Sequence, residues 1–422
     1  MTKIAIPHLH RIEGEAGFWT EVTRTGEIKD LRIKTLEGLR QIEGILIGRR
    51  FPEIPIVVAR ICGICSVAHI VNACSAIEKA LKVEVSETTV LLRKLILASQ
   101  IIQSHTLHLF FLSLADFFDI DNDLVLMKKF PKETESALKI RDFGLEITKI
   151  VGGREIHPMA LKIGGFSRLP EKEKLAKMLD KTGGTLEAAL ILANLFKNLD
   201  YPDFSRETQL VSLGGENEYP FYSTENVLVN GGQEPIDTFF SAGIKEELKS
   251  PPVKRARYRG KPYMLGAIAR VSNNSSLLNP VARKLFFEFK KEKKNIFSNT
   301  FFNIFYQAVE VVHFIEESEK LIRQLLKTEL INEAPEIKIK KGKGLSAMEA
   351  PRGTLFTYFE LDERGRIKNC NIITPTAQFL DNIEADLREY LPTILKVKKE
   401  EKIRKIRAMI RVYDPCISCA TH

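Results

Sequence analysis

Apolar residues recur about every 3.6 positions over long stretches of the chain, as in helices that bury one face. The first such stretch is Val67–Leu81. A longer one follows Ser86, a residue type that caps helices, and runs from Val90 to Phe118. Gly183 and Gly184 are expected to interrupt one of the later helices. Those helices are predicted over residues 134–151, 171–199, 276–294, 300–328 and, with breaks, 376–410.

Shorter segments alternate between apolar and polar residues, which indicates strands. Residues 15–36 alternate around Gly26, as expected of a two-stranded hairpin. Residues 205–268 combine Gly, Pro, Tyr and Ser with short strand-like runs, and residues 336–374 read as strands between glycines. The pattern therefore predicts an α+β fold that is mainly α, with β elements at its periphery.

The charge pattern argues against a nucleic-acid partner. The 422 residues are 44% apolar and 28% charged, with a net charge of +9, which is typical of a globular protein. The basic clusters at Lys290–Lys294, Lys338–Lys343 and Lys396–Arg407 contain Glu or apolar residues but no interleaved aromatics. They favour solvated helix faces or a protein partner over nucleic acid.

Nothing in the sequence indicates export or a membrane span. The N-terminus has no apolar signal block. The longest apolar candidate, Leu95–Phe118, carries His105, His108 and Asp116, so a buried helix explains it better. Four of the six cysteines lie in C-x-x-C pairs, which favours metal binding in a reducing compartment over disulfides. We therefore expect a cytoplasmic protein.

The two cysteine pairs lie near opposite ends of the chain. Cys62 and Cys65 are followed by His69, and Cys416 and Cys419 are followed by His422. A C-x-x-C turn directs two sulfurs toward one metal ion. A structural zinc ion with four cysteines remains an alternative, although zinc ribbons place their pairs about 15–20 residues apart.

Because the two pairs must meet in space, we expect one large domain over residues 1–422. Its predicted regions are an N-terminal hairpin region (about 1–60), a helical body (about 67–200 and 276–328), peripheral β and loop regions (about 205–268 and 336–374) and a C-terminal helix with a metal-binding tail (about 376–422).

The motifs Arg-x-Cys62-Gly-x-Cys65-x-x-x-His69 and Asp414-Pro-Cys-x-x-Cys-x-x-His resemble those of the large subunit of nickel–iron hydrogenases, over most of the chain. The segment Asp-Pro-Cys-Ile-Ser-Cys is similar to the cytoplasmic, nucleotide-linked group that includes the sulfhydrogenases. The resemblance implies a long central helical bundle beside a buried metal site. It also implies a mature chain, because related precursors lose a C-terminal extension at this point.

The resemblance also implies the catalytic centre. Nickel would be held by Cys62, Cys65, Cys416 and Cys419, and Cys65 and Cys419 would bridge to an iron with one carbonyl and two cyanide ligands. Cys416 would take the proton from dihydrogen. Glu13, in an Arg-Ile-Glu-Gly motif, would relay that proton toward the surface.

Further residues gain roles by the same resemblance. Glu43, the main-chain carbonyl of Ile372, and His422 would bind a second cation, magnesium or iron(II). Arg352, in Glu-Ala-Pro-Arg-Gly, would act at the open metal position and pair with Asp414. Groups expected to contact the cyanide ligands or a bridging thiolate are Pro351, Arg352, Thr376 and His69. Two departures from the family pattern are Ser104, where many members have Asp, and Phe379, where Asn is frequent.

Electrons must leave this chain, because it has no further cysteine set for an iron–sulfur cluster and no Gly-rich nucleotide motif. The resemblance implies an iron–sulfur small subunit and, beyond it, FAD-containing diaphorase subunits that reduce NAD(P). Two alternatives stay open: coupling to a deazaflavin or heterodisulfide reductase, and a non-catalytic scaffold like the quinone-site subunit of complex I. The scaffold has lost the metal-binding cysteines, which this chain retains.

Overall fold

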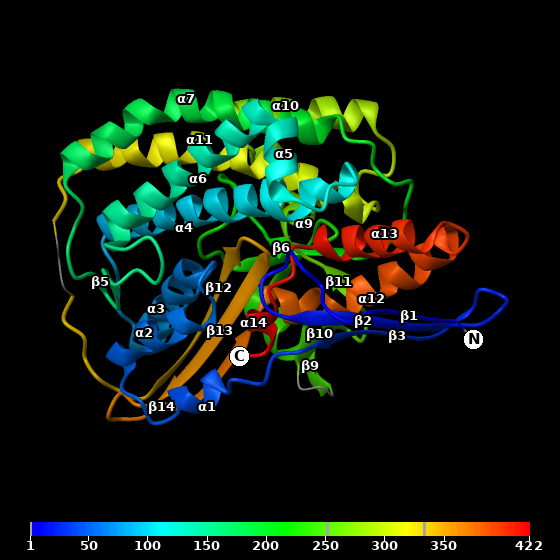
Figure 1. Ribbon diagram of the computed structural model, residues 1–422. Helices are drawn as coiled ribbons and strands as arrows, with labels where there is room; N and C mark the ends of the chain where they lie inside the picture. Colours follow the sequence, from blue (N-terminus) through cyan, green and yellow to red (C-terminus); the bar gives the residue numbers. More distant parts are fainter. Residues whose placement is uncertain (1, 250–252, 332–334) are drawn as a thin grey trace.

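The computed structural model describes residues 2–249, 253–331 and 335–422 (Figure 1). The helices are α1 (Ile42–Leu46), α2 (Ile54–Val58), α3 (Ser66–Leu81), α4 (Glu87–Leu107), α5 (Asp123–Lys129), α6 (Pro131–Gly152), α7 (Lys172–Lys197), α8 (Ile236–Thr238), α9 (Ala267–Asn274), α10 (Pro280–Glu292), α11 (Asn303–Lys327), α12 (Pro375–Ile394), α13 (Lys399–Arg411) and α14 (Ile417–Ala420). The strands are β1 (Thr2–Ile6), β2 (Ala16–Val22), β3 (Ile28–Thr35), β4 (Leu161–Lys162), β5 (Gly165–Phe166), β6 (Gln209–Leu213), β7 (Asn226–Val229), β8 (Gly232–Pro235), β9 (Ile244–Lys249), β10 (Val253–Tyr258), β11 (Tyr263–Met264), β12 (Gly342–Ala350), β13 (Gly353–Leu361) and β14 (Ile367–Ile373).

The long helices α4, α6, α7 and α11 pack against one another as a bundle, which forms the upper layer in Figure 1. Their predicted positions are confirmed, and Ser86 caps α4 by accepting a hydrogen bond from the Thr89 amide. The expected interruption at Gly183 and Gly184 is wrong, because α7 runs through both. Neighbouring Ala and Leu residues support the helix there, and its length outweighs the local cost of two glycines.

The segment Glu87–Phe117 is long and apolar enough to cross a membrane, but 78% of its most apolar window is buried inside the protein. The sequence predicted one helix as far as Phe118, but the last part of this segment is not α-helical. A π-helical turn (His108–Ser113) and a 3-10 turn (Leu114–Phe117) continue α4. Such burial is typical of a helix in the core of a globular protein.

Below the bundle, the hairpin β12–β13 lies on α3 and pairs with β14. Glycines allow this close approach. A Cβ at Gly342 would lie 2.0 Å from the Ala80 carbonyl oxygen, and one at Gly344 would lie 1.9 Å from that of Ala76. The hairpin turn, at Pro351 and Arg352, is thereby held beside the start of α3.

The predicted hairpin of residues 15–36 is confirmed as β2 and β3, and β1 adds a third antiparallel strand that the sequence pattern missed. A four-stranded sheet (β11–β6–β7–β8) and the pair β9–β10 form the region 205–268. The C-terminal α14 lies centrally, against α12 and β10 (Figure 1). The tail therefore packs against elements from the middle and the C-terminal part of the chain.

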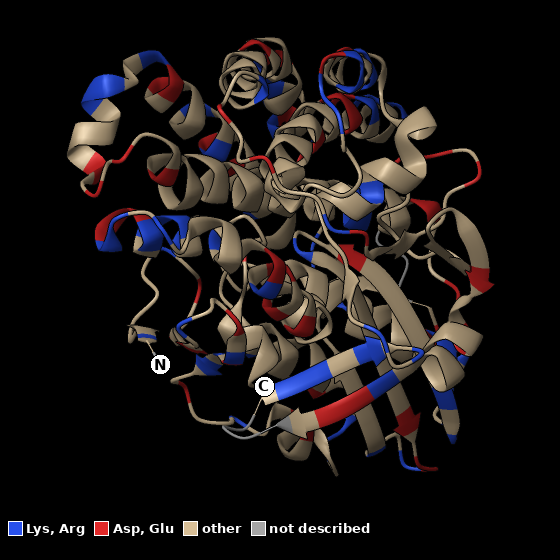
Figure 2. Ribbon diagram, turned by 90° about the vertical axis from the view of Figure 1, so that its right-hand side faces the viewer, with Lys and Arg blue, Asp and Glu red and all other residues tan. Residues whose placement is uncertain are grey.

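Charges of both signs are interspersed over the face shown in Figure 2. On α13, for example, Lys405 and Glu401 form an ion pair at 3.0 Å. This face therefore does not carry the single-signed field that attracts a polyanion.

Candidate metal centre

The first cysteine pair lies where a short helix ends and α3 begins. Cys62 has an extended backbone directly after the 3-10 turn Ala59–Ile61, and Cys65 is the residue that precedes α3. Both side chains are 3% exposed. The break between two helices points both sulfurs to one side, as the C-x-x-C spacing predicts.

The second pair lies on the C-terminal tail. Cys416 precedes the short helix α14, and Cys419 belongs to it. The segment around Glu13 holds this tail, because the Ile417 amide donates to the Glu13 carbonyl at 2.9 Å. Arg40 also donates to the Ser418 carbonyl. The tail is thus fixed by contacts to the N-terminal region.

The four sulfurs of Cys62, Cys65, Cys416 and Cys419 all lie within 4.8 Å of one another. The Cys416 sulfur is 3.5 Å from that of Cys62 and 2.8 Å from that of Cys419, and the sulfurs of Cys65 and Cys419 are 3.3 Å apart. Two metal–sulfur bonds of about 2.3 Å span at most about 4.6 Å, and these three separations are all shorter than that. The four sulfurs are therefore close enough together for a shared metal centre.

The electrostatics of this cluster favour bound cations. Hydrogen bonding from the Cys416 thiol, above all, lowers the pKa of Cys62 well below its usual value. Burial, followed by the interaction with Cys419, raises the pKa of Cys416 well above its usual value. Four buried thiolates repel one another unless metal ions offset their charge, so the donor set fits a soft-metal centre.

Glu13 lies directly against this cluster. The Cys416 thiol donates to Glu13 Oε2 at 2.9 Å, and the Ser418 hydroxyl donates to Glu13 Oε1 at 2.7 Å. Burial, and then the charge on Cys62, raises the pKa of Glu13. The carboxylate is only half-buried, so it connects the thiol with a more exposed part of the protein.

Arg352 and Asp414 form the expected buried pair, with Arg352 Nη2 2.8 Å from Asp414 Oδ1. Arg352 Nε also donates to the Asp414 carbonyl at 2.6 Å. Its Nη1 has no partner among the described residues, although the atom is buried. Burial opposes the charge of Arg352, but Asp414 and the thiols outweigh this and raise its pKa well above its usual value. The guanidinium therefore stays charged and retains a free donor.

Thr376 and His69 also reach the cysteines. The Thr376 hydroxyl accepts from the Cys416 amide at 3.0 Å and can still donate its own proton. His69 Nε2 lies 3.7 Å from the Cys419 sulfur. Burial lowers the pKa of His69 to about 3, so its imidazole is neutral.

The three expected ligands of a second cation also converge. His422 Nε2 lies 3.0 Å from the Ile372 carbonyl oxygen and 3.9 Å from Glu43 Oε1. Lys254 was not predicted at this site. Its ammonium lies 2.7 Å from the same Glu43 oxygen and 3.4 Å from the Ile372 carbonyl oxygen.

His422 indicates that these residues fit a cation. Burial, with the charge of Lys254, lowers the pKa of its imidazole to about 4. Its Nδ1 lies 2.5 Å from the Cys419 carbonyl oxygen, while Nε2 faces that of Ile372. A neutral imidazole carries one N–H, so only one of its ring nitrogens can donate to a carbonyl oxygen. The lone pair of the other nitrogen then faces the lone pairs of a carbonyl oxygen and is repelled by them. A cation bound by Nε2, the carbonyl and Glu43 would remove that repulsion.

The remaining histidines and cysteines lie away from the four sulfurs. His105, His108 and His313 are buried and hydrogen-bonded, whereas His8 and His10 are exposed. The lone cysteines are Cys74, which is fully buried, and Cys370, which is half-buried and donates to the Glu43 carbonyl. The two family departures also lie in the interior: Ser104 has a buried hydroxyl that finds no partner in the described part of the chain, and Phe379 packs on Tyr413.

Sequence reasoning missed Arg270, which binds the main chain next to Arg352, and Ser418, which binds Glu13. Ser418 could have been found, because it stands inside the second cysteine pair. Arg270 had no such signal, because nothing in the sequence around it marks a buried arginine.

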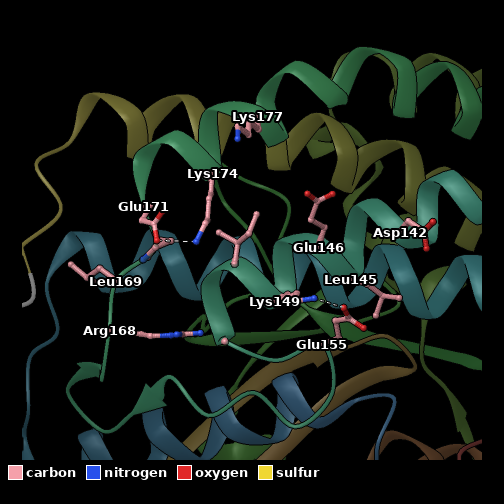
Figure 3. A pocket seen from close by; sticks show the side chains of 13 residues that line it. Asp142, Leu145, Glu146, Lys149, Glu155, Arg168, Leu169, Glu171, Lys174 and Lys177 are labelled. Atoms are coloured by element: carbon pink, nitrogen blue, oxygen red, sulfur yellow. Dashed lines mark hydrogen bonds and ion pairs between the residues drawn. The ribbon is translucent and has the colours of Figure 1, made fainter.

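A cavity of about 760 Å³ lies between α6 and α7. Figure 3 shows the side chains that line it. Its walls carry two ion pairs, Lys149–Glu155 at 3.2 Å and Lys174–Glu171 at 2.8 Å. None of its lining residues belongs to the metal centre. The cysteine cluster, which lies in the packed interior, is the stronger candidate for the functional site.

The fold and the four-cysteine centre define a protein that can bind metal in its interior, between segments from the two ends of the chain. The family model described as nickel-dependent hydrogenase matches residues 40–137 and 205–422. The chain therefore belongs to the nickel-dependent hydrogenase family and is an oxidoreductase that acts on dihydrogen.

Two relatives and one solved structure illustrate the likeness. Sulfhydrogenase 1 subunit alpha of Pyrococcus furiosus is 34% identical, over 99% of this chain and 97% of its own length. NAD-reducing hydrogenase HoxS subunit beta of Cupriavidus necator is 26% identical, over 100% and 94%. The structure of an NAD+-reducing NiFe hydrogenase in the H2-reduced state has a TM-score of 0.90, with 23% identity and full coverage of both chains. It shares the fold.

Proposed function

We propose that this chain is the catalytic large subunit of a nickel–iron hydrogenase that cleaves dihydrogen reversibly and heterolytically. Electrons would pass through an iron–sulfur small subunit to NAD(P). The observation that carries this proposal is the meeting of four sulfurs from both ends of the chain, with the Glu13 carboxylate on one of them.

Cys62, Cys65, Cys416 and Cys419 would hold nickel, with Cys65 and Cys419 also holding an iron that bears one carbonyl and two cyanide ligands. When bound, this centre supplies the polarisation that lets the bond of dihydrogen break heterolytically. Soft thiolates suit both metals. The sulfurs of Cys65 and Cys419 lie 3.3 Å apart, which is close enough for both to bind one iron.

The protein then has to move a proton. The Cys416 sulfur would accept it, and Glu13 would take it over across the 2.9 Å contact. The raised pKa of Glu13 brings its affinity for a proton closer to that needed near neutral pH. Its second oxygen accepts a hydrogen bond from the Ser418 hydroxyl at 2.7 Å.

The other residues would orient the centre. Arg352, fixed by Asp414, would direct its unpartnered Nη1 toward the open metal position. Because a guanidinium does not lose its proton, we assign it orientation and electrostatic stabilisation. Pro351 and Thr376 would contact the cyanide ligands, and His69 would support a bridging thiolate.

Glu43, the Ile372 carbonyl and His422 would hold magnesium or iron(II), which would fix the tail over the centre. Lys254, on the same carboxylate, would then turn aside from the ion. This assignment is supported because a cation at this place would remove the repulsion between the His422 lone pair and the carbonyl oxygen.

Partner subunits follow from what the sequence lacks. Besides the four clustered cysteines it has only Cys74 and Cys370, too few for an iron–sulfur cluster. We therefore propose an iron–sulfur small subunit and FAD-containing diaphorase subunits, in a cytoplasmic complex. The name of the Cupriavidus necator relative supports NAD(P) as acceptor, and a deazaflavin is the rival.

The test is metal analysis and infrared spectroscopy of the complex purified under hydrogen. We expect one nickel and carbonyl and cyanide bands, all lost in Cys62→Ser and kept in Cys74→Ser, a matched change of a buried cysteine outside the cluster. Zinc alone, without those bands, would refute the proposal. Hydrogen-dependent reduction of NAD+, NADP+ or a deazaflavin then identifies the acceptor.

A further inference from the structure

We propose that Arg270 is a positioning residue that sets the place of Pro351 and Arg352 at the metal centre. This inference rests on the proposed function, because it concerns how the hairpin turn between β12 and β13 meets the bound metals. Arg270 lies on α9, and its side chain is 0% exposed.

One side of the guanidinium binds the main chain of the turn. Arg270 Nη1 donates to the Ala350 carbonyl at 2.9 Å, and Nη2 donates to the Pro351 carbonyl at 3.0 Å. Nη1 also lies 3.1 Å from a carboxylate oxygen of Glu349. Three successive residues that lead into Arg352 are therefore tied to one side chain.

The other side is anchored to the helical bundle. Arg270 Nε and Nη2 both donate to Glu310 of α11, each at 2.6 Å. Tyr219 donates to Glu310 Oε1 at 2.7 Å, and His105 lies 2.9 Å from Oε2. The Glu310 carboxylate is thus held by four polar contacts from three side chains in the buried interior, where charge-assisted hydrogen bonds are strongest.

Backbone packing leaves the turn little other freedom. A Cβ at Gly266, which has a φ of 83° just before α9, would lie 3.3 Å from the Arg352 carbonyl oxygen. A Cβ at Gly353 would lie 2.6 Å from that of Leu265. The start of α9 therefore touches the turn directly, and Arg270 fixes the turn's carbonyls from the same helix.

Only arginine can make this set of contacts. Its planar fork has five donors, which here serve two carbonyls and two carboxylates, whereas a lysine has three donors on one nitrogen. In Arg270→Lys the ion pair with Glu310 can persist while the carbonyls of Ala350 and Pro351 lose their donors. That substitution therefore separates positioning from simple charge balance.

Arg93 offers a matched control. It is also 0% exposed, and it binds both oxygens of Glu78 at 2.7 and 2.6 Å, but it makes no contact with the turn. The experiment compares Arg270→Lys with Arg93→Lys in the purified complex, with nickel content measured first. The readouts are the cyanide stretching bands, kcat per nickel and thermal stability.

We expect both variants to lose stability, and Arg270→Lys alone to shift the cyanide bands and lower kcat per nickel by about 10- to 100-fold, as small misplacements do. Unshifted bands and unchanged kcat in Arg270→Lys would overturn the inference. If that variant does not accumulate, Tyr219→Phe, which removes one donor to Glu310, decides by the same bands. A wild-type complex without nickel would instead refute the proposed function.

Discussion

Replacing Glu13 by glutamine tests the proposed proton route with little change of shape. The carboxylate contacts the Cys416 sulfur at 2.9 Å and accepts from the Ser418 hydroxyl at 2.7 Å and the Ser418 amide at 3.2 Å. Glutamine keeps one oxygen, which can still accept from the Ser418 hydroxyl, whereas the bond from the Ser418 amide goes to the other oxygen and is lost. Its amide, however, cannot take up a proton from the thiol, so the change removes the chemistry and retains much of the packing.

The expected size of the effect follows from this contact. A positioned acid or base typically contributes about 10²- to 10⁴-fold to a rate. Glu13 is half-buried, so water can partly replace it, and we expect the lower part of that range, a loss of about 10²- to 10³-fold. Nickel content should stay at the wild-type level, because Glu13 is not among the four sulfur donors.

The assay is exchange between deuterium gas and protons of the solvent, which requires no electron acceptor and so isolates proton transfer. Glu15→Gln, which neutralises an exposed carboxylate two residues away, is the control and should exchange as the wild type does. The reasoning fails if Glu13→Gln, with full nickel, exchanges within about threefold of the control, a far smaller loss than removal of an acid–base group causes.

Three further outcomes can be measured. Asp414→Asn should lower the free energy of unfolding by about 3 kcal/mol, as judged by denaturant titration, because it leaves the buried charge of Arg352 without its anion. Wild-type thermal stability should fall when a chelator is added, whereas the stability of His422→Ala should not depend on added magnesium. If the wild type and the variant respond equally to magnesium and chelator, the second cation is not bound there. Gly183→Ala should raise the unfolding free energy by about 1 kcal/mol, because its Cβ meets no atom within 4 Å on an exposed helix face.

The helices were predictable because their signal is local. The spacing of apolar residues in α6 and α10 reports directly which face is buried, and Ser86 marks where α4 starts. The cysteine cluster was predictable for a different reason. A C-x-x-C pair supplies two sulfur ligands, and two such pairs in one chain indicate that they bind a shared metal ion. Neither signal depends on knowing the rest of the fold.

Charged residues of the interior were not predictable in this way. Arg270 lies among small and polar residues, and Lys254 lies in a basic strand, so both read as surface positions. Arg270 is buried because Glu310 of α11 and Glu349 of β12 meet it from distant parts of the chain. A buried charge depends on such partners, and their meeting is a property of the tertiary structure.

The tail shows how far this dependence reaches. The four residues of α14 are too few to form a stable helix alone, since isolated helices need about 12–15 residues. What orders them are distant contacts: Glu13 to the Ile417 amide, Arg40 to the Ser418 carbonyl, and the Thr374 hydroxyl to the Cys419 carbonyl at 2.8 Å. Because the same segment carries Cys416 and Cys419, docking of the tail and assembly of the four-sulfur site are one event. The centre can therefore form only after the body that receives the tail has folded.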